Sequence, residues 1–562
     1  MGDGQAVSFD AETPTATWHP TWRRTSAMRC RPASRHLFGL LAERAALLPR
    51  HQAIVTNSGS RTYGEWLRGA GRVAAALTQA GVGAGDTVAL LAPNGIEWLE
   101  VAFGCAAVGA RLAPVNTWVR VAELDYLLGF SRATVLVAVD RAGQHDFVSD
   151  LRELVPELWR EPPGCWSAAR LPRLRSVVLI GQEIPRGAIG YADWAAVTPP
   201  GGQHAVRPAD DVALVLFTSG STARPKGVAL THGHLIENGF EIGERQGLGP
   251  DDRLFLASPL FWSLGSANAL MAALTHATTL VLQPQFDPAG ALDLIEQNGC
   301  TAIYTLPLMT HALLSDGAYR PERVASLRRG LTFGSPSEVR QAVEDLGVDL
   351  ICNLYGGTEV YGNCCVSPHD APAGRRVAAS GPPLPGVEVQ IVDPRTGAPA
   401  APGELGEIRV RGRVSPGYLT ESGDLAPVTD DEGWFATQDL GTIGPDGWLE
   451  FAGRSSEMIK TAGINVSPAE VEDFLLGHDD VVEAAVTGVP HPLRGEEVVA
   501  FVRLRPGSST GPDALREWAR ARIASYKVPA RILVVKDFPR TSTGKLARRE
   551  LRAAAAGDAN GQ

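Results

Sequence analysis

The segment 213–228 reads ALVLFTSGSTARPKGV, and it decides the class of fold. Its first five residues are apolar and predict a short buried strand. The strand runs directly into a turn of Thr, Ser and Gly that contains Lys226. Backbone N–H groups, hydroxyls and a cation at the end of a strand are the groups that bind a polyphosphate. We therefore expect an α/β fold with a nucleotide loop here, and a polar surface loop is the alternative for this segment alone.

The loop is not a Walker A loop. That loop needs a second glycine directly before its lysine and a Ser or Thr directly after it. Here Pro225 precedes Lys226 and Gly227 follows it. Because proline has no N–H to donate, the chemistry excludes a P-loop as firmly as the pattern does.

Helical and strand patterns alternate on both sides of the loop, which is typical of α/β architecture. In the first unit we expect helices at 37–46, 63–80 and 96–108 and strands at 87–91 and 134–138. A second unit has expected strands at 212–217, 253–256, 279–282 and 302–305, mostly parallel and buried. Residues 386–414 alternate Val and Ile between Gly and Pro, which indicates antiparallel strands in a small barrel-like section.

With 562 residues, the chain is longer than one hydrophobic core usually supports. We expect a loosely ordered lead-in at 1–35, a large N-terminal domain at 36–452, a small mobile α+β domain at 453–552 and a disordered tail at 553–562. Ser467 and Pro468 open a predicted helix that runs to Leu476 in the small domain, with Glu470 as a capping partner.

Composition excludes several classes of function. The net charge of −10 argues against nucleic acid as a partner. Seven cysteines without paired spacing fit a reducing compartment, and the adjacent Cys364 and Cys365 are expected to be buried thiols. The N-terminus lacks a secretory pattern, and no apolar stretch approaches the roughly 20 residues that a membrane span needs. We expect a cytoplasmic protein.

Four further segments follow the loop: YGGTE at 355–359, TQDL at 437–440, GRSSEMIKTAGINVSPAEVE at 453–472 and PRTSTGK at 539–545. Together with 218–228 they resemble, in order, the motifs of the acyl-adenylate-forming superfamily, which includes acyl-CoA synthetases, peptide-synthetase adenylation domains and firefly luciferase. The resemblance covers about residues 36–552. It implies that an acid and ATP form acyl-AMP, which CoA then converts to a thioester.

The resemblance also implies roles for single residues. It puts the Tyr355 ring against adenine, Thr358 on the α-phosphate, Glu359 on Mg²⁺, and Asp439 with Arg454 at the ribose. The remaining nucleotide-binding candidates are Thr218, Ser219, Gly220, Ser221, Thr222, Lys226, Gly334, Ser335, Pro336 and Gly356. One carboxylate together with substrate phosphates is the usual way to hold Mg²⁺. Alone, the two glycines of YGGTE would indicate only a turn, and Asp439 only a loop residue.

The small domain of relatives supplies the groups for both half-reactions. Lys545 resembles the lysine that bridges carboxylate and phosphate oxygens during adenylation, where neutralising charge lowers the barrier. Ser456 resembles the hinge about which the domain rotates. After rotation the segment 460–466, with Lys460 and Gly463, would form the CoA channel, where a glycine lets the cofactor's narrow arm pass.

This chain departs from the family at four positions. Ala223 and Gln438 replace the usual glycines, Trp262 stands where many relatives have His, and Ser456 replaces a common Asp or Lys. Trp262, Gly265, Phe333 and Gly357 are the candidate acyl-pocket residues. A large ring in that pocket suggests an apolar acid, with aromatic or polycyclic acids included, although a core Trp without ligand contact is an equal alternative.

Other functions stay open on the sequence alone. The departures cluster in the half-reaction that uses ATP, so one alternative is a ligase impaired in adenylation that thioesterifies acyl-AMP from a partner enzyme. Further alternatives are the loading of a separate carrier protein, a luciferase-like oxidation and a non-catalytic nucleotide sensor on the same fold.

Overall fold

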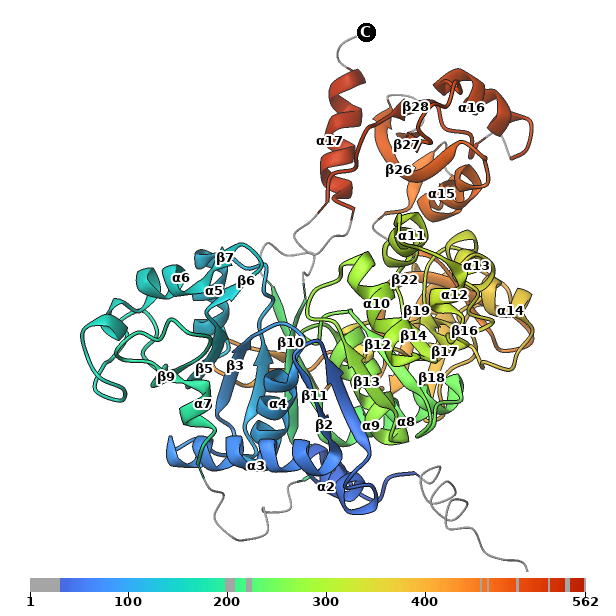
Figure 1. The fold of residues 1–562 in the computed structure, drawn as a ribbon. Coiled ribbons are helices and arrows are strands. Elements are labelled where there is room, and N and C mark those ends of the chain that lie inside the picture. Colours follow the sequence, from blue (N-terminus) through green and yellow to red (C-terminus); the bar gives the residue numbers. More distant parts are fainter. Residues whose placement is uncertain are drawn as a thin grey trace, which may run out of the picture.

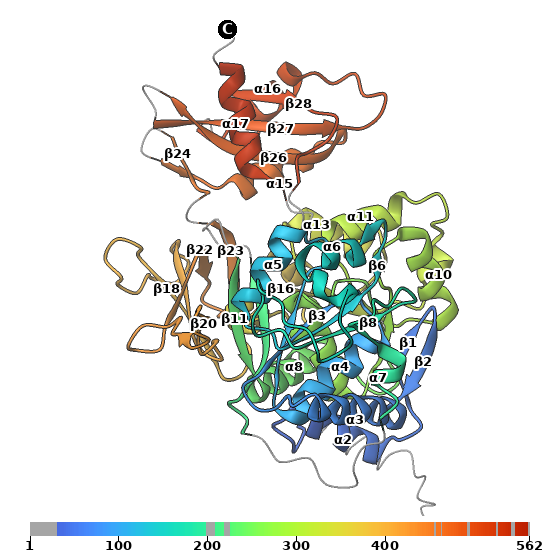
Figure 2. The ribbon, with the colours of Figure 1, turned by 90° about the vertical axis from the view of Figure 1, so that its left-hand side faces the viewer.

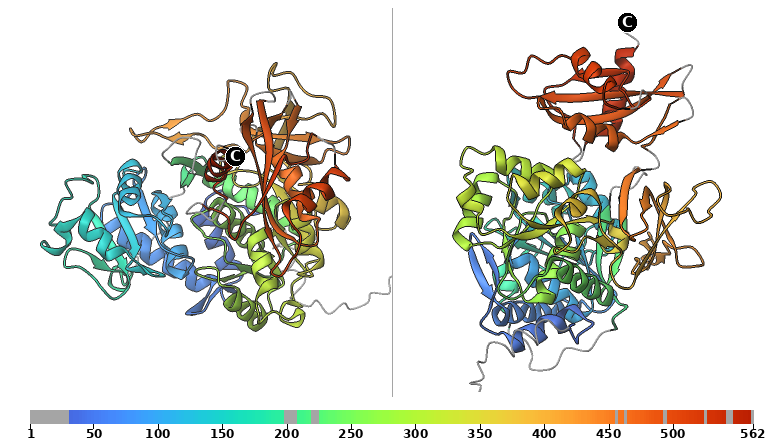
Figure 3. Two further views of the ribbon diagram at one scale, coloured as in Figure 1. Left: turned by 90° about the horizontal axis from the view of Figure 1, so that it is seen from above. Right: turned by 90° about the vertical axis from the view of Figure 1, so that its right-hand side faces the viewer.

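The computed structural model describes residues 31–197, 208–218, 225–454, 457–461, 464–491, 495–523, 526–540 and 546–559. A large body comprises the residues up to Arg454, and a smaller domain lies above it (Figure 1). Seen from above and from the right in Figure 3, the small domain sits over one part of the large body. None of the described helices is both long and apolar enough to cross a membrane. The expected division into two α/β sheets, an antiparallel section and a small C-terminal domain is confirmed.

The first sheet has nine strands in the order β21-β20-β11-β10-β4-β3-β5-β8-β9. Its central strands are buried along their whole length because helices cover them. The strands are β3 (Thr87–Leu91), β4 (Arg111–Pro114), β5 (Val135–Val139), β8 (Ser176–Ile180), β9 (Ile189–Gly190), β10 (Val212–Thr218), β11 (Lys226–Thr231), β20 (Tyr418–Leu419) and β21 (Leu425–Ala426). A separate hairpin joins β6 (Arg141–Ala142) and β7 (His145–Asp146).

The second sheet has eight strands in the order β17-β16-β15-β14-β12-β13-β1-β2. Its inner strands are parallel, and only the edge pairs β1–β2 and β16–β17 are antiparallel. The strands are β1 (Gln52–Thr56), β2 (Gly59–Thr62), β12 (Arg253–Leu256), β13 (Thr279–Leu282), β14 (Ala302–Tyr304), β15 (Arg329–Thr332), β16 (Leu350–Tyr355) and β17 (Cys365–Val366).

One predicted strand lies in the other sheet, and a strand that was not predicted joins the second sheet. β10 was expected in the second unit, but it pairs with β4 of the first sheet, with Leu214 opposite Leu112. The strand β1, which the sequence analysis did not predict, comes from the N-terminal part and pairs with β13 of the second sheet. An apolar run predicts that a strand is buried and does not specify its neighbour, so the prediction of sheet membership was wrong here.

Helices α3 (Tyr63–Gln79) and α4 (Ile96–Val108) share one hydrophobic core with both sheets. Their backbones approach closely, since a Cβ on Gly104 of α4 would lie 2.5 Å from Cγ1 of Val73. The other helices of the large body are α2 (Leu37–Leu47), α5 (Val121–Phe130), α6 (Phe147–Leu154), α7 (Tyr191–Trp194), α8 (His232–Gln246), α9 (Met271–His276), α10 (Pro288–Asn298), α11 (Pro307–Ser315), α12 (Pro321–Val324), α13 (Pro336–Glu344) and α14 (Ala373–Ala378). The helices predicted at 37–46, 63–80 and 96–108 are confirmed.

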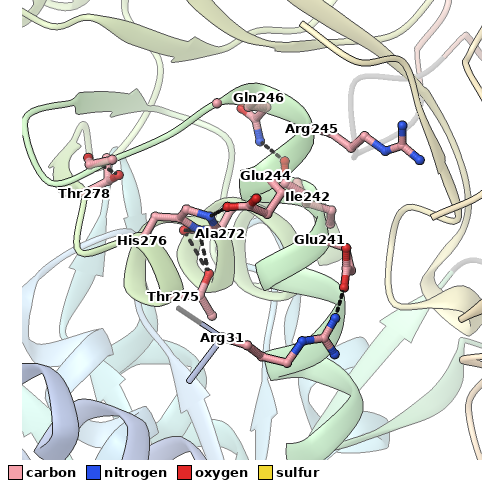
Figure 4. Close-up of polar contacts among 12 residues, drawn as sticks. Arg31, Glu241, Ile242, Glu244, Arg245, Gln246, Ala272, Thr275, His276 and Thr278 are labelled. Carbon is pink, nitrogen blue, oxygen red and sulfur yellow. Dashed lines mark hydrogen bonds and ion pairs between the residues drawn. The ribbon is translucent and has the colours of Figure 1, made fainter. Parts of the chain in front are cut away.

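The last five residues of the predicted lead-in are fixed to α8. Arg31 forms an ion pair with Glu241, and Arg35 forms one with Glu237. Figure 4 shows the Arg31–Glu241 contact beside the end of α8, where Glu244 also bonds His276. The expectation of loose order is therefore wrong for residues 31–35, and residues 1–30 lie outside the described part.

The antiparallel section is a four-stranded sheet in the order β18-β19-β22-β23 at one side of the large body (Figure 2). Its strands are β18 (Val387–Val392), β19 (Gly406–Gly412), β22 (Phe435–Ile443) and β23 (Leu449–Arg454). The predicted boundary between Ala452 and Gly453 falls inside β23, because Arg454 still pairs with Asp439 of β22. The large part of the chain thus ends with a strand that carries two candidate site residues.

The small domain packs three helices on a five-stranded sheet. Its strands are β24 (Ile459–Thr461), β25 (Ile464–Val466), β26 (Val481–His491), β27 (Gly495–Leu504) and β28 (Arg531–Val534), and its helices are α15 (Pro468–Leu476), α16 (Pro512–Arg520) and α17 (Arg548–Ala559). The predicted start of α15 is confirmed, since the Ser467 side chain accepts from the Glu470 N–H. The expected disordered tail from 553 is wrong up to Ala559: Ala555 is buried, and the alanine run there favours helix.

Candidate active site

A cleft of about 2960 Å³ lies between the large body and the small domain. It receives residues from the ends of strands in both large sheets, from the antiparallel section and from the small domain. Ligands of α/β proteins bind where parallel strands end, so this is the place expected for a substrate site.

The cleft brings together most of the residues that the sequence singles out. Those that line it are Thr218, Lys226, Trp262, Phe333, Gly334, Ser335, Pro336, Tyr355, Gly356, Gly357, Thr358, Glu359, Asp439 and Arg454. Ser219, Gly220, Ser221, Thr222, Ala223, Ser456, Gly463 and Lys545 lie outside the described residues, as does the side chain of Lys460. Gly265 is described but does not line the cleft.

Gly265 has a packing role in the structure. A Cβ on this residue would lie 2.2 Å from the carbonyl oxygen of Pro259, so only glycine fits. It belongs to a π-helical turn, Leu264–Leu270, that leads into α9. Such turns occur often at functional sites because they redirect side chains. Gly265, predicted as an acyl-pocket residue, does not line the cleft, whereas Asn268 of the same turn does.

The expected phosphate loop connects two antiparallel strands. Thr218 ends β10 and pairs with Lys226, which begins β11. The ammonium of Lys226 lies 4.9 Å from the centre of the Tyr418 ring, within the range of a cation–π contact. The loop therefore leaves the sheet and returns to it at the cleft, with a lysine at its second end.

Tyr355 and Asp439 meet at the buried end of the cleft. The Tyr355 hydroxyl donates to Oδ2 of Asp439 at 2.9 Å, and Nε of Arg454 lies 3.2 Å from Oδ1. Burial raises the pKa of Asp439, and Arg454 opposes the shift. The Tyr355 ring also stacks on Phe451, with ring centres 5.7 Å apart. Flat rings beside a carboxylate suit a nucleoside, which offers a base to stack and ribose hydroxyls to donate.

Glu359 and Thr358 lie in a turn that follows β16. Oε1 of Glu359 accepts from the Tyr418 hydroxyl at 2.9 Å. The Thr358 hydroxyl donates to Oγ of Ser263 at 3.3 Å, which connects this turn to the start of the π-helical segment. A carboxylate and a hydroxyl on one short turn can serve a cation and a phosphate together.

Ser335 opens α13 with a capping box: its hydroxyl accepts from the N–H of Glu338, whose carboxylate accepts from the N–H of Ser335. Gly334 adopts φ +149°, a conformation that side chains disfavour, and a Cβ there would lie 2.6 Å from Oε2 of Glu338. Burial raises the pKa of Glu338. The segment 334–336 thus presents open backbone to the cleft.

An aromatic cluster forms the wall on the other side of Thr358. The Trp118 ring meets Phe261 and Trp262 edge to face, with ring centres 5.5 and 5.4 Å apart. Six of the nine exposed large apolar residues in the described parts of the chain line the cleft: Trp118, Leu308, Phe333, Leu405, Phe451 and Tyr526. This concentration of apolar surface marks a ligand site.

Sequence reasoning missed Trp118, Ser263 and Tyr418. Trp118 follows β4, and its N–H donates to Oδ1 of Asn116 in a local turn. An aromatic residue in the loop that follows a parallel strand was the available signal, because the ends of such strands meet at the substrate edge. Tyr418 had no such signal, since it lies far from Glu359 in sequence.

On the small domain, Arg540 and Leu546 both line the cleft and form an isolated β-bridge with each other. They flank the segment 541–545, which contains Lys545. By contrast, Ile459 and Thr461, which flank Lys460, are absent from the lining residues. The face of the small domain that carries Arg540 and Leu546 is therefore the one turned toward the cleft.

Comparison with known proteins agrees with this site. Residues 41–419 match the model of the AMP-binding enzyme family, and residues 470–545 match the AMP-binding enzyme C-terminal domain. The chain is 34% identical over 512 residues to a feruloyl-CoA synthase of an Amycolatopsis species, covering 91% of this chain and 97% of that protein. It is 28% identical over 529 residues to the mitochondrial medium-chain acyl-CoA ligase ACSF2 of Mus musculus, covering 91% and 85%.

Among solved structures, the anthranilate CoA ligase AuaEII in complex with anthranoyl-AMP matches with a TM-score of 0.82 and 27% identity, covering 94% of this chain and 99% of that chain. These matches confirm the resemblance to acyl-adenylate-forming enzymes. The chain belongs to the AMP-binding enzyme family and is an ATP-dependent, AMP-forming acyl-CoA ligase.

Proposed function

We propose that this ligase activates an apolar aromatic carboxylic acid. The observation that carries the proposal is the cluster of Trp118, Phe261 and Trp262 on the cleft wall, one contact away from Thr358 through Ser263. Rings set edge to face form an apolar corner in which a planar acyl group can stack on one ring and contact the edge of another. The relative and the solved structure whose names mention feruloyl and anthranoyl groups support an aromatic acid, whereas the medium-chain relative does not.

For adenylation, the Tyr355 ring, which stacks on Phe451, would lie against the adenine, and Asp439 would accept from the ribose hydroxyls while Arg454 keeps it ionised. Thr218, Ser219, Gly220, Ser221, Thr222 and Lys226 would hold the phosphates, with Gly334, Ser335, Pro336 and Gly356 beside the nucleoside. Thr358 would donate to the α-phosphate. Lys545 would neutralise the charge that builds up as the carboxylate attacks phosphorus and pyrophosphate leaves.

Glu359 fits the role of a Mg²⁺ ligand. Its Oε1 is oriented by Tyr418, and the described residues contain no cluster of three or more metal-binding side chains. A single carboxylate is sufficient for a cation that is bound largely by substrate phosphates and water. Bound there, the cation would supply charge stabilisation to the phosphates.

For the second half-reaction we propose a rotation about Ser456 that brings Lys460 and Gly463 to the cleft. The thiolate of CoA would then attack the acyl carbonyl and release AMP. The orientation of the small domain supports two states, because the flanks of Lys545 line the cleft and the flanks of Lys460 do not. In this proposal, the face that carries Lys545 serves adenylation and the face that carries Lys460 serves thioester formation.

A ligase impaired in adenylation is a second candidate, supported by Gln438. This residue adopts φ +63°, a left-handed conformation that costs free energy for any residue with a Cβ, directly beside Asp439. Such an enzyme would depend on acyl-AMP from another enzyme.

Two assays test these proposals. Acid-dependent exchange of pyrophosphate into ATP measures adenylation, and thioester formation from preformed acyl-AMP and CoA measures the second step. Exchange with cinnamate or benzoate derivatives supports the aromatic acid, and normal exchange excludes the impaired ligase. Exchange only with aliphatic acids contradicts the aromatic proposal. Lys545→Ala is expected to abolish exchange and to leave thioester formation from acyl-AMP intact.

A further inference from the structure

The cleft wall contains buried amide groups without partners. Oδ1 of Asn268, both side-chain polar atoms of Asn363 and Oγ of Ser258 have no hydrogen-bond partner among the described residues. All three residues line the cleft, and each is only 1% exposed. A buried polar atom without a partner is costly, so native proteins rarely keep several in one place without a ligand or water.

The surrounding contacts hold these side chains in place. Nδ2 of Asn268 donates to the carbonyl oxygen of Ser263 at 3.2 Å, which fixes the amide and leaves its Oδ1 as the free acceptor. The carbonyl oxygen of Asn363 accepts from Nδ2 of Asn238 at 3.0 Å, so the main chain is fixed and the side chain is not used. The carbonyl oxygen of Ser258 similarly accepts from Asn94.

Asn268 and Asn363 belong to neighbouring segments. A Cβ on Gly362 would lie 2.1 Å from Nδ2 of Asn268, so the π-helical turn packs directly against the residue before Asn363. A Cβ on Gly356 would lie 2.7 Å from the Cα of Asn363. Because glycine occupies both positions, three layers can pack against one another in this wall. They are the turn that carries Thr358 and Glu359, then Asn363, then Asn268.

The chemistry of these atoms selects a ligand group. Asn268 can only accept at its free oxygen, Asn363 can donate and accept, and Ser258 can do both. A hydroxyl or an amine satisfies this set because each donates and accepts. A second carboxylate has no proton for Asn268, and a methyl group or a hydrogen satisfies none of the atoms.

We propose that the acid activated by this enzyme carries a hydroxyl or amino group on its acyl part, and that Asn268, Asn363 and Ser258 receive it. The proposal rests on the proposed function and narrows it: the walls from Trp118, Phe261 and Trp262 accept a ring, and the amide pair accepts its polar substituent. A site built to hydrogen-bond a substrate hydroxyl rejects the analogue that lacks it, because its own buried groups then stay unpaired.

The test compares matched acids. The probes are benzoate with its 3-hydroxy, 4-hydroxy and 4-amino derivatives and cinnamate with its 3-hydroxy and 4-hydroxy derivatives, and kcat/KM for thioester formation is measured for each. We expect the best substituted acid to exceed its unsubstituted parent by at least about tenfold. Asn363→Leu, which removes the amide at similar volume, is expected to lower this ratio about tenfold by improving the parent and weakening the substituted acid.

Matched variants separate recognition from folding. Asn298→Leu makes the same change at a half-buried site outside the cleft and is expected to leave the ratio unchanged. The melting temperature of ligand-free Asn363→Leu is expected to equal or exceed that of the native enzyme, because an unpaired amide is removed. If Asn363→Leu does not fold, Ser258→Ala, which deletes one buried hydroxyl, is expected to lower the same ratio severalfold.

Two results would overturn the inference: a ratio near one in the native enzyme, which means that only water meets these amides, or a high ratio that neither variant changes. Both leave the ligase proposal intact. Absence of pyrophosphate exchange with every aromatic acid, together with exchange on aliphatic acids, is the separate failure of the aromatic proposal, and this inference falls with it.

Discussion

The hydroxyl of Tyr418 donates to Oε1 of Glu359 at 2.9 Å, which joins strand β20 of the first sheet to the turn after β16 of the second. The same Tyr418 ring carries the Lys226 ammonium on its face. One side chain thus connects the end of the phosphate loop with the proposed metal ligand. A hydrogen bond to a ligating carboxylate fixes its orientation.

Replacing Glu359 and Tyr418 in turn should distinguish the side chain that binds Mg²⁺ from the side chain that orients it. Glu359→Gln keeps the shape but removes the charge that a cation needs, and pyrophosphate exchange should fall roughly a hundredfold. Tyr418→Phe should retain most of the maximal rate and raise the Mg²⁺ concentration for half-maximal exchange about tenfold. Mg²⁺ titration of both variants is the measurement. An unchanged Mg²⁺ requirement in Tyr418→Phe would show that the contact is not functional.

The ionised carboxylate of Asp439 is expected to favour ATP binding but to lower the stability of the fold. Burial raises its pKa, so the folded protein binds this proton more tightly than the unfolded chain does. Folding stability from this group is therefore greatest at low pH and is lost as pH rises above the ordinary range of Asp through the raised pKa. Asp439→Asn should unfold at a higher temperature than the native enzyme at neutral pH, with the difference vanishing at low pH, and should bind ATP about tenfold more weakly.

Thermal unfolding between pH 4 and pH 8 and nucleotide titration check both parts. Asp431→Asn, at an exposed turn, serves as the control and should change neither. A variant that loses stability at neutral pH would mean that Arg454 and Tyr355 stabilise the ionised carboxylate more than burial destabilises it.

Gln438 lies in a bulge of β22, where the pairing with β19 shifts register between Glu407 and Arg409. Bulges re-aim the neighbouring side chain, and here that neighbour is Asp439. Because the left-handed conformation at φ +63° strains a residue with a Cβ, Gln438→Gly should raise the free energy of unfolding by up to about 1 kcal/mol. Gln390→Gly, in the regular strand β18, should lower it by about as much.

Denaturant unfolding of the two glycine variants gives the comparison, and pyrophosphate exchange shows whether the strain matters for adenylation. Faster exchange in Gln438→Gly would support the impaired ligase. Equal destabilisation by both substitutions would mean that the bulge tolerates glutamine without strain.

Trp118 should control the fit of the acid. Trp118→Ala removes one ring of the aromatic wall that Phe261 and Trp262 hold in place, and one ring–ring contact with the acid is worth about 0.5–1.5 kcal/mol, so KM for an aromatic acid should rise about two- to twelvefold with little change for acetate. Trp434→Ala, outside the cleft, is the control. The measurement is the steady-state KM for the aromatic acid and for acetate. An equal rise in KM for both acids would mean that Trp118 stabilises the fold and does not contact the acyl group.

The contiguous parts of this site were predictable from the sequence, and the assembled parts were not. Tyr355, Thr358 and Glu359 occur within five residues, so a local pattern reveals them. Trp118 and Trp262 come from segments more than a hundred residues apart, and only the fold makes them neighbours. The unpaired atoms of Asn268 and Asn363 leave no trace in the sequence, because satisfaction of a polar group is a property of its surroundings.

Two of the incorrect fold predictions have a similar cause. The strand β10 was assigned to the wrong sheet because its apolar residues show burial but not a partner. A disordered tail was predicted from residue 553 because the ending AAAAGDANGQ is typical of a frayed terminus, whereas Leu551 and Ala555 are buried in one cluster with Phe538 and helix α17 continues to Ala559. Tertiary packing overrides local signals in both.

A contact between the two domains gives the last prediction. The N–H and the hydroxyl of Ser337 on α13 both donate to Oδ1 of Asp473 on α15, at 3.1 and 2.5 Å. Because α13 begins at the nucleotide segment 334–336, this pair ties the small domain to the nucleotide side of the cleft, in the orientation in which Arg540 and Leu546 line the cleft. Asp473→Ala should lower pyrophosphate exchange about tenfold, as expected for hydrogen bonds to a charged group, and leave thioester formation from preformed acyl-AMP unchanged or faster.

Two controls make that result specific. Asp473→Asn keeps an oxygen that accepts from Ser337 and should restore most of the exchange activity, whereas Asp480→Ala removes an acidic side chain whose partner, Thr510, belongs to the small domain itself and should affect neither step. Equal losses in both half-reactions would mean that Asp473 stabilises the fold of α15. A loss confined to adenylation requires that the domain orientation bound through Ser337 is the one in which acyl-AMP forms.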